Sequence, residues 1–352
     1  MLMLGSQVLA SPQISTNSVT TPATQGLNIQ ISPLPLQLEA TPGTTVSSDI
    51  RVRNTGTTDE ILTTSIKGVT AEGQDGHIVF HDLKPTDDLS QWVQLSPSTF
   101  TAPAGQWQTV TMTVNVPKTA AFDYDYSVEF AQANPPQPKP GQTAIRGAAD
   151  VFVLLQVNAP GALRQAVVTS FIANHKTYEY LPVDFQVIVY NSGNIHVSPH
   201  GNIFITKGKT QVGVLNVNQG LGNILPKSNR VFTATWSDGF PVYANVLDAN
   251  GQTIDNGHGQ TKKKLNWNSS QLSKFRFGRY TANVVMVYND GKSDIPISAT
   301  VSFWVIPWRL LAIVVGAIGT VVALLVYVIV LRRRLKKSGG WKKNRHVKTA
   351  QG

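Results

Sequence analysis

Two pairs of histidines are the residues whose type and spacing first raise the question of chemistry in this chain. The first pair, His77 and His81, lies in DGHIVFHD beside Asp75 and Asp82. Imidazole and carboxylate side chains together can hold a metal ion. On a β-strand, however, residues four apart are separated by about 13 Å, which is too far to share one ion unless the strand bends. We therefore predict no metal site at this pair.

The second pair, His196 and His200, lies in NSGNIHVSPHG, where a predicted turn would let side chains approach more closely. A metal site is one interpretation of this pair. The interpretation that we prefer is that Asn191, Asn194 and His196 hydrogen-bond the backbone of their own loop, as polar side chains commonly do in turns.

Known catalytic and cofactor-binding motifs do not fit the chain. Gly208-Lys209-Thr210 resembles a phosphate-binding loop, but Ile203 stands where the motif requires its first glycine. Neither G-x-S-x-G nor H-E-x-x-H occurs, and the chain has no cysteine for thiol catalysis or metal ligation. We predict a non-enzyme with no catalytic, cofactor-binding or metal residues. The alternative, an enzyme site built from scattered residues, would require a concave acidic pocket.

The elements that must position these residues are predicted to be β-strands. Apolar residues alternate with polar ones in many short segments, and Gly, Pro and Asn separate the segments. The clearest alternations are Val110, Met112, Val114 and Val116, and Val183, Phe185, Val187 and Val189. No long amphipathic helical pattern occurs before residue 306. The pattern predicts an all-β ectodomain of two tandem Ig-like antiparallel β-sandwiches.

An Asn-x-Gly turn occurs once in each predicted sandwich, which we interpret as a weak internal repeat of one plan. The turns are Asn54-Thr55-Gly56 and Asn191-Ser192-Gly193, and each follows a predicted strand. Asn tolerates left-handed backbone angles and Gly adopts positive φ readily, so we expect both residue types to serve the turn in this way.

A long apolar segment follows the second sandwich. Residues 310–331 carry no charge, and a helix of 22 residues reaches about 33 Å, enough to cross a bilayer core. Trp304 and Trp308 precede it at the position of an interfacial aromatic belt, and Arg332, Arg333 and Arg334 follow it. Because basic residues stay on the cytoplasmic side, we predict a type I single-pass membrane protein. Residues before 306 would be extracellular and the tail cytoplasmic.

Five segments result: a signal-peptide remnant and flexible spacer at 1–26, a first Ig-like sandwich at 27–158, a second at 159–306, a transmembrane helix at 307–331 and a basic cytoplasmic tail at 332–352. The net charge of +10 belongs mainly to the tail, which holds nine of the 30 Lys and Arg residues and no Asp or Glu. Residues 1–331 are therefore near neutral, which argues against a nucleic-acid partner.

Tryptophans outside the apolar segment are candidates for stacking on sugars if they are exposed. Core packing is the commoner role. Trp267, in KKKLNWNSS, is the best candidate for ligand stacking because its neighbours are polar.

Several stretches together resemble one protein family. IQISPLPLQLEATPGTTVSSDIRVRNTG is similar to the opening of the peptidoglycan-binding domain of WxL-interacting surface proteins of Gram-positive-type bacteria. VYNSGNIHVSPHGNIFI, FGRYTANVVMVY and SFWVIPWRLL resemble the second Ig-like domain and the C-terminal membrane anchor of that family. The resemblance implies cell-wall peptidoglycan as a partner of the first domain and external cell-surface proteins as partners of the second.

These observations predict a membrane-anchored binding or scaffold protein of the bacterial cell surface, with a role in adhesion or cell-wall binding. Its partners would be peptidoglycan or cell-surface proteins, together with the lipid bilayer through residues 310–331. The alternative is a structural subunit of an envelope membrane complex, in which the span and the tail make the specific contacts.

Overall fold

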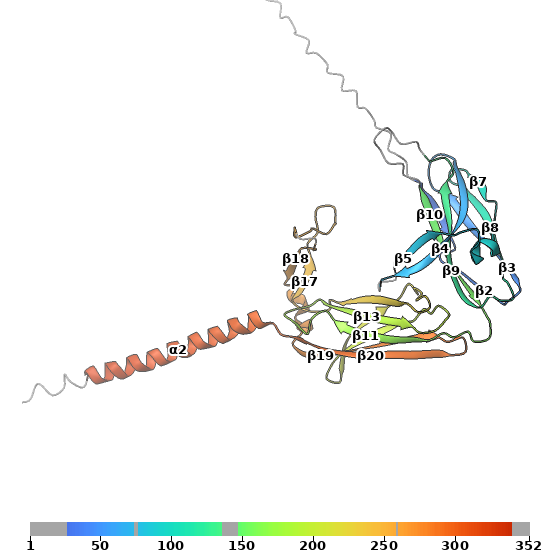
Figure 1. Ribbon diagram of the computed structural model, residues 1–352. Coiled ribbons are helices and arrows are strands. Elements are labelled where there is room, and N and C mark those ends of the chain that lie inside the picture. Colours follow the sequence, from blue (N-terminus) through green and yellow to red (C-terminus); the bar gives the residue numbers. More distant parts are fainter. Residues whose placement is uncertain (1–26, 74–76, 136–146, 258–259, 340–352) are drawn as a thin grey trace, which may run out of the picture. The chain divides into compact units, whose positions relative to one another are not determined.

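The computed structural model describes residues 27–73, 77–135, 147–257 and 260–339 (Figure 1). The chain divides into two compact units. The first unit comprises Met1–Gly68, Phe80–Ala120 and Asp125–Leu155, and the second comprises Val69–Val79, Ala121–Tyr124 and Gln156–Gly352. The predicted signal-peptide remnant and spacer, and the tail beyond residue 339, lie outside the described residues.

Strands β1 to β10 form two sheets. One sheet has the order β1-β3-β8-β6, and the other has the order β2-β10-β9-β4-β5, with β7 paired to β4. These strands, with the short helix α1, are β1 (Ile29–Ser32), β2 (Leu36–Ala40), β3 (Thr45–Asn54), β4 (Glu60–Glu72), β5 (His77–Asp82), α1 (Asp88–Trp92), β6 (Val93–Ser96), β7 (Thr99–Ala102), β8 (Trp107–Asn115), β9 (Phe122–Gln132) and β10 (Ala148–Val157).

The core between these sheets is built from the alternation that the sequence shows. On β8, Val110, Met112 and Val114 are fully buried, while the residues between them are not. On β3, which pairs with β8 in antiparallel register, Ile50 and Val52 are fully buried in the same way. Side chains alternate across a strand, so one face of each strand fills the core and the other meets solvent.

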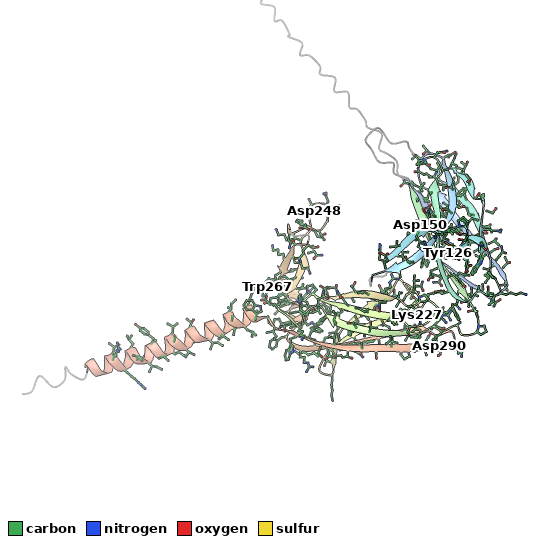
Figure 2. All side chains as sticks on the ribbon, in the orientation of Figure 1. Tyr126, Asp150, Lys227, Asp248, Trp267 and Asp290 are labelled. Atoms are coloured by element: carbon green, nitrogen blue, oxygen red, sulfur yellow. The ribbon has the colours of Figure 1, made fainter. Side chains whose placement is uncertain are left out.

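Asp150 is an acidic residue of β10, and Tyr126 is a buried residue of the neighbouring strand β9 (Figure 2). The Ser127 hydroxyl donates a hydrogen bond of 2.7 Å to its carboxylate. Burial nevertheless raises the pKa of Asp150 above its usual value, because the charged form loses water. The folded protein therefore holds this proton more tightly than the unfolded chain does.

Replacing Asp150 by Asn is expected to stabilise the first unit at neutral pH. Because the pKa of Asp150 is higher in the folded state, its contribution to the stability of the fold is fully present below the unfolded-state pKa. That contribution is lost as the pH rises through the folded-state pKa. D150N removes that loss and keeps an acceptor for Ser127. Urea midpoints should rise at pH 7 and match the parent near pH 3. Asp49→Asn, whose carboxylate accepts a 2.7 Å bond from Thr111 on an exposed face, is the control and should change little.

Strands β11 to β20 form the second sandwich. Its sheets have the orders β11-β13-β16 and β12-β20-β19-β14-β15, and β17 and β18 form a separate antiparallel hairpin. The short β12 pairs with β20 in parallel, an exception to the antiparallel plan. The elements are β11 (Ala166–Ala173), β12 (Thr177–Tyr178), β13 (Val183–Asn191), β14 (His200–Lys207), β15 (Thr210–Val217), β16 (Asn229–Trp236), β17 (Val242–Asn245), β18 (Lys263–Asn266), the 3-10 helix η1 (Ser269–Lys274), β19 (Gly278–Asn289) and β20 (Asp294–Val305).

The second core contains a cluster of aromatic rings. Trp236 is buried to 1% exposure, and its ring centroid lies 5.4 Å from that of Tyr280 and 6.1 Å from that of Phe303. Tyr280 and Phe303 stack at 5.8 Å. These rings bury large apolar areas, and they join the two sheets because Trp236 ends β16 while the others belong to β19 and β20. The predicted fold class, two Ig-like sandwiches followed by an apolar helix, is confirmed.

Helix α2 (Trp308–Gly339) begins three residues after β20 ends. Its stretch Trp308–Leu335 is long and apolar enough to cross a membrane, and its most apolar window is not buried by the described protein. The helix continues beyond Leu331, the predicted end of the span, through the three arginines that follow. Arg and Lys are good helix formers, which explains the longer helix.

Candidate functional site

Asn191 is a buried polar residue at the end of β13, and its side chain organises the following loop. It is 0% exposed. Its amide donates to the carbonyls of Ile195 at 2.8 Å and Ile224 at 2.9 Å, and its carbonyl accepts from the N–H of Gly193 at 2.9 Å. One side chain therefore bonds three backbone groups of a buried turn, where polar groups need partners. Two of these groups have a further bond: the Gly193 N–H also donates to the carbonyl of Gln165 at 3.2 Å, and the Ile224 carbonyl also accepts from the N–H of Val197 at 3.1 Å.

Asn54 repeats this arrangement in the first unit. It is 1% exposed, and its amide donates to the carbonyls of Thr58 at 2.7 Å and Ala102 at 2.9 Å. Its carbonyl accepts from the N–H of Gly56 at 2.9 Å. The bonds within each loop have the same offsets of two and four residues, while the bond to a distant carbonyl spans 48 residues for Asn54 and 33 for Asn191. The two loops are therefore held by the same local arrangement.

The reason expected for the two glycines is wrong, because neither Gly56 nor Gly193 has a positive φ. Space explains Gly193 instead. A Cβ there would lie 2.3 Å from the carbonyl oxygen of Leu163 and 2.8 Å from the backbone nitrogen of Gln165. At Gly56 the only near atom is the side-chain oxygen of Asn54, at 3.0 Å.

Asn194 and His196 follow in the second loop. The Asn194 side chain accepts from the N–H of Leu163 at 2.7 Å and donates to the carbonyl of Gly161 at 3.0 Å. His196 departs from the expectation that it bonds the loop backbone. Its ring nitrogen lies 2.7 Å from the carboxylate of Asp123, which also accepts from the His196 N–H at 2.9 Å. The sequence could not show this because Asp123 lies 73 residues earlier.

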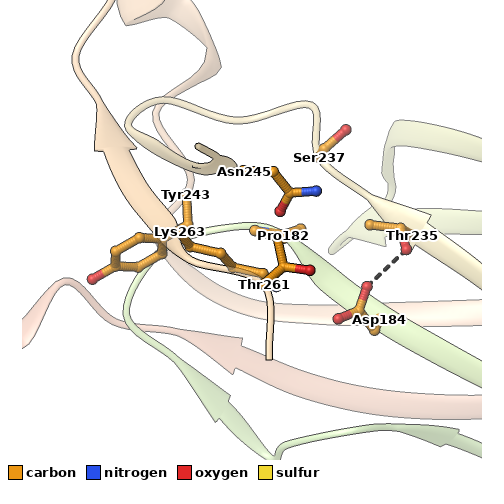
Figure 3. Close-up of a pocket in the computed structure, with 8 residues that line it drawn as sticks. All are labelled: Pro182, Asp184, Thr235, Ser237, Tyr243, Asn245, Thr261 and Lys263. Carbon is orange, nitrogen blue, oxygen red and sulfur yellow. Dashed lines mark hydrogen bonds between the residues drawn. The ribbon is translucent and has the colours of Figure 1, made fainter. Parts of the chain in front are cut away.

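A polar pocket in the second unit is the best candidate for a binding site. It has a volume of about 380 Å³ and lies where the β17–β18 hairpin meets the ends of β13 and β16 (Figure 3). The residues that line it offer hydroxyl, amide, carboxylate, ammonium and phenol groups. They are Pro182, Asp184, Thr235, Ser237, Tyr243, Asn245, Thr261 and Lys263.

The chemistry of this pocket is hydrogen bonding. Asp184 and Thr235 are opposite each other on β13 and β16, and the Thr235 hydroxyl donates a 2.7 Å bond to the Asp184 carboxylate. Lys263 opposite Asn245 adds a cation and an amide from the hairpin. Donors and acceptors on an open polar surface fit a polar ligand such as a sugar or a peptide. Sequence reasoning missed this site because its residues span positions 182–263 with no motif.

A second hollow of about 340 Å³ lies in the first unit. It is lined by aliphatic side chains and hydroxyl groups, namely Thr64, Ser65, Ile66, Leu83, Ser90, Val93, Leu95 and Ser98. The Thr64 hydroxyl already donates to the carbonyl of Ser98 at 3.3 Å. This hollow offers fewer groups of different chemistry than the hairpin pocket, and it carries no charged side chain.

The remaining predicted residues are three tryptophans near the start of α2 and three arginines further along that helix. Trp267 directly follows β18 and is 57% exposed (Figure 2). Its ring lies edge-on to Tyr180 at 6.4 Å and to Phe240 at 5.6 Å. Trp304 and Trp308 are 46% and 57% exposed. The three arginines Arg332, Arg333 and Arg334 are exposed on α2.

No family model and no curated protein sequence matches the chain. Among solved structures it is similar to the class 5 fimbriae chaperone CfaA, with 15% identity and a TM-score of 0.37 over 76% of this chain and 97% of that one. A chaperone–tip adhesion subunit complex of Csu pili from Acinetobacter baumannii shows 13% identity and a TM-score of 0.36 over 77% and 97%. A PapD-like domain of human CEP192 shows 18% and 0.26 over 42% and 97%. All three likenesses are distant.

Proposed function

We propose that this chain is a membrane-anchored cell-surface protein that presents two Ig-like domains for binding. The observation that carries the proposal is α2. Its apolar stretch is not covered by the described protein, it follows the last strand of a folded domain, and basic residues follow it. A solvent-exposed helix of this composition would be strongly unfavourable in water, whereas a bilayer would bury it.

The orientation is proposed to place both domains outside and the basic tail inside. The chain has no cysteine, so single-cysteine variants can test this without background labelling. A membrane-impermeant maleimide should label Leu221→Cys on intact cells, because Leu221 is an exposed residue of the second domain. It should label Ser338→Cys only after the membrane is opened. The reverse pattern would overturn the topology, and extraction of the parent chain by carbonate would overturn the span.

The binding part of the proposal rests on the hairpin pocket, and the ligand class that we propose is cell-wall glycan with its peptide stems. Such a ligand carries hydroxyl, amide and carboxylate groups, for which Asn245 and Lys263 offer partners. The family resemblance implies peptidoglycan as a partner of the first domain and external cell-surface proteins as partners of the second. A glycan ligand in this pocket of the second domain therefore rests on the chemistry of the residues that line it.

Purified full-length chain in detergent is expected to co-sediment with peptidoglycan, and N245A is expected to weaken this. Loss of one hydrogen bond to a ligand costs about 1 kcal/mol, or roughly fivefold in affinity. The control is S90A in the hollow of the first unit, which should leave binding unchanged if the hairpin pocket is the site. Loss of binding in S90A alone would move the site to the first unit. Failure to bind either peptidoglycan or an envelope protein would overturn the binding role.

Replacing α2 by an unrelated apolar helix separates this proposal from a role as a membrane-complex subunit. A surface-binding protein needs only an anchor, so binding by the outer domains should survive the exchange. Loss of function with normal membrane insertion and folding would favour the subunit role, in which the span itself makes specific contacts.

A further inference from the structure

Four exposed apolar side chains gather at the end of the second unit from which α2 departs. Leu272 is 62% exposed, Trp267 is 57% exposed, and Phe277 and Phe275 are 44% and 40% exposed. We call these four residues the collar. A group of exposed apolar side chains on a folded domain commonly marks a site that binds another protein, a ligand or a membrane.

The strand register places the collar beside the start of α2. Gly278, the residue after Phe277, pairs with Val305 across β19 and β20. Val305 is three residues before Trp308, and three residues of extended chain span at most about 11 Å. With the cross-strand distance and the step from Gly278 to Phe277 included, the collar begins at most about 20 Å from the first residue of the helix.

Contacts between side chains give the same placement independently. Arg309, in the first turn of α2, lies 3.6 Å from the carboxylate of Glu179. The neighbour of Glu179 is Tyr180, whose ring packs edge-on against Trp267 at 6.4 Å. A chain of contacts thus joins the helix start to the first residue of the collar.

The collar is held by local structure, so its apolar residues are not the free ends of a loop. Helix η1 carries Leu272, and Asn268 caps this helix by accepting from the N–H of Ser270. The N–H of Phe275 donates to the carbonyl of Leu272 at 3.1 Å, and the N–H of Phe240 donates to the carbonyl of Lys274 at 3.0 Å. The backbone of this segment is therefore fixed by hydrogen bonds, and the apolar side chains are exposed in an ordered conformation.

The charges near the collar favour an anionic partner. Lys262 and Lys264 are exposed on the strand segment that leads to Trp267, and Arg279 is exposed just after Phe277. The acidic residue Asp238 is already paired, with Lys274 at 2.6 Å and Arg276 at 3.0 Å. Cations beside exposed aromatic and aliphatic groups are the composition that binds the surface of an anionic bilayer.

We propose that the collar inserts into the headgroup region of the outer membrane leaflet, beside the span, and seats the second domain on the bilayer. This rests on the proposed function, since only a spanning α2 brings the collar to a membrane. The interfacial layer is about 5–8 Å deep on each side of the hydrocarbon core, enough to take Trp and Phe rings. The domain then contacts the bilayer in two ways: through α2, to which it is joined by the chain, and through the side chains of the collar.

A fluorescent probe at single cysteines in the full-length chain tests the collar. Variants Leu272→Cys, Leu221→Cys and Ile318→Cys carry an environment-sensitive dye and are reconstituted into vesicles of phosphatidylcholine with phosphatidylglycerol. Leu221 is the matched control, because it is a leucine of similar exposure, 54%. Its carbonyl accepts from the hydroxyl of Ser198, which lies two residues before β14. The first residue of β14 pairs with Val287, near the end of β19 that is opposite to Gly278 and the collar. Ile318 reports on the span.

The expected result is a blue-shifted dye at Leu272, quenched by brominated lipid and protected from aqueous iodide, with a fully aqueous dye at Leu221. An aqueous dye at Leu272 together with a lipid-protected dye at Ile318 would overturn the collar and leave the anchor intact. An aqueous dye at Ile318 would overturn the anchor itself. The dye at Leu272 should be less protected from iodide in vesicles of pure phosphatidylcholine than in vesicles that also contain phosphatidylglycerol. In the K262Q/K264Q variant the two kinds of vesicle should give equal protection. Equal protection of the parent in both lipids would overturn the role of the charges.

Discussion

Asn191→Ala is expected to destabilise the second domain by about 3 kcal/mol. The substitution removes the side-chain bonds to the carbonyls of Ile195 and Ile224 and to the N–H of Gly193. The Ile224 carbonyl then keeps its bond from the N–H of Val197 at 3.1 Å, and the Gly193 N–H keeps its bond to the carbonyl of Gln165 at 3.2 Å. An unsatisfied buried backbone group costs about 1–3 kcal/mol, and alanine cannot reach any of the three. A domain with a stability of about 5–15 kcal/mol would lose a large part of it.

Asn54→Ala should also destabilise the first domain, because Asn54 makes the same kinds of bond. We expect a smaller loss, since its bonds to Thr58 and Gly56 are only partly buried, whereas all three bonds of Asn191 are buried. Asn289→Ala is the control. Asn289 accepts from the N–H of Gly291 at 2.8 Å in a turn, but it is exposed, so water can replace it. Hydrogen–deuterium exchange on the full chain reports each domain separately. A loss at Asn191 as small as that at Asn289 would contradict the role assigned to the buried amide.

Asn191→Asp sharpens the same prediction. It keeps an acceptor for Gly193 but directs an oxygen toward two carbonyl oxygens. Burial would raise the pKa of the introduced carboxyl, so its charged form is the unfavourable one. The loss of stability relative to the parent should therefore be greater at pH 7 than at pH 4, and the exchange measurement at both values checks this sign.

The β-strands and the apolar helix could be predicted because their signals are local. The alternation Val183, Phe185, Val187, Val189 records which face of β13 is buried, and all four side chains are buried to 1% exposure or less. The uncharged stretch after the last strand likewise predicts a helix of membrane length. An alternation of period two and an uncharged run can both be recognised without knowing which residues lie opposite them in the fold.

The site residues depended on partners that lie far away in the sequence. Asn191 donates to the carbonyl of Ile224, which lies 33 residues away, and Asn54 donates to that of Ala102, which lies 48 residues away. The hairpin pocket joins Pro182 to Lys263 only because β17 and β18 fold back over the sheet. The collar residues alternate with polar neighbours in the sequence, and only the register of β19 with β20 shows that they lie near the helix.

Gly193→Ala is expected to destabilise the second domain by about 3 kcal/mol, while Gly56→Ala in the first domain should cost less than about 1 kcal/mol. Both glycines occupy the same place in the repeated motif, and neither needs a left-handed backbone. The difference comes from the surroundings. A methyl group at Gly193 would stand 2.3 Å from the Leu163 carbonyl oxygen, and both that segment and the loop would have to separate.

That separation would break bonds that hold the loop to the start of the second domain. The N–H groups of Ser192 and Asn194 donate to the carbonyls of Gln165 at 2.8 Å and Leu163 at 2.9 Å, and Leu163 in turn donates to Asn194. Exchange protection should therefore fall first at residues 192–197 and then across the domain. At Gly56 the near atom is one side-chain oxygen at 3.0 Å, which can shift by a few tenths of an ångström. Equal losses at the two positions would show that the glycines serve the shared turn and not their different neighbours.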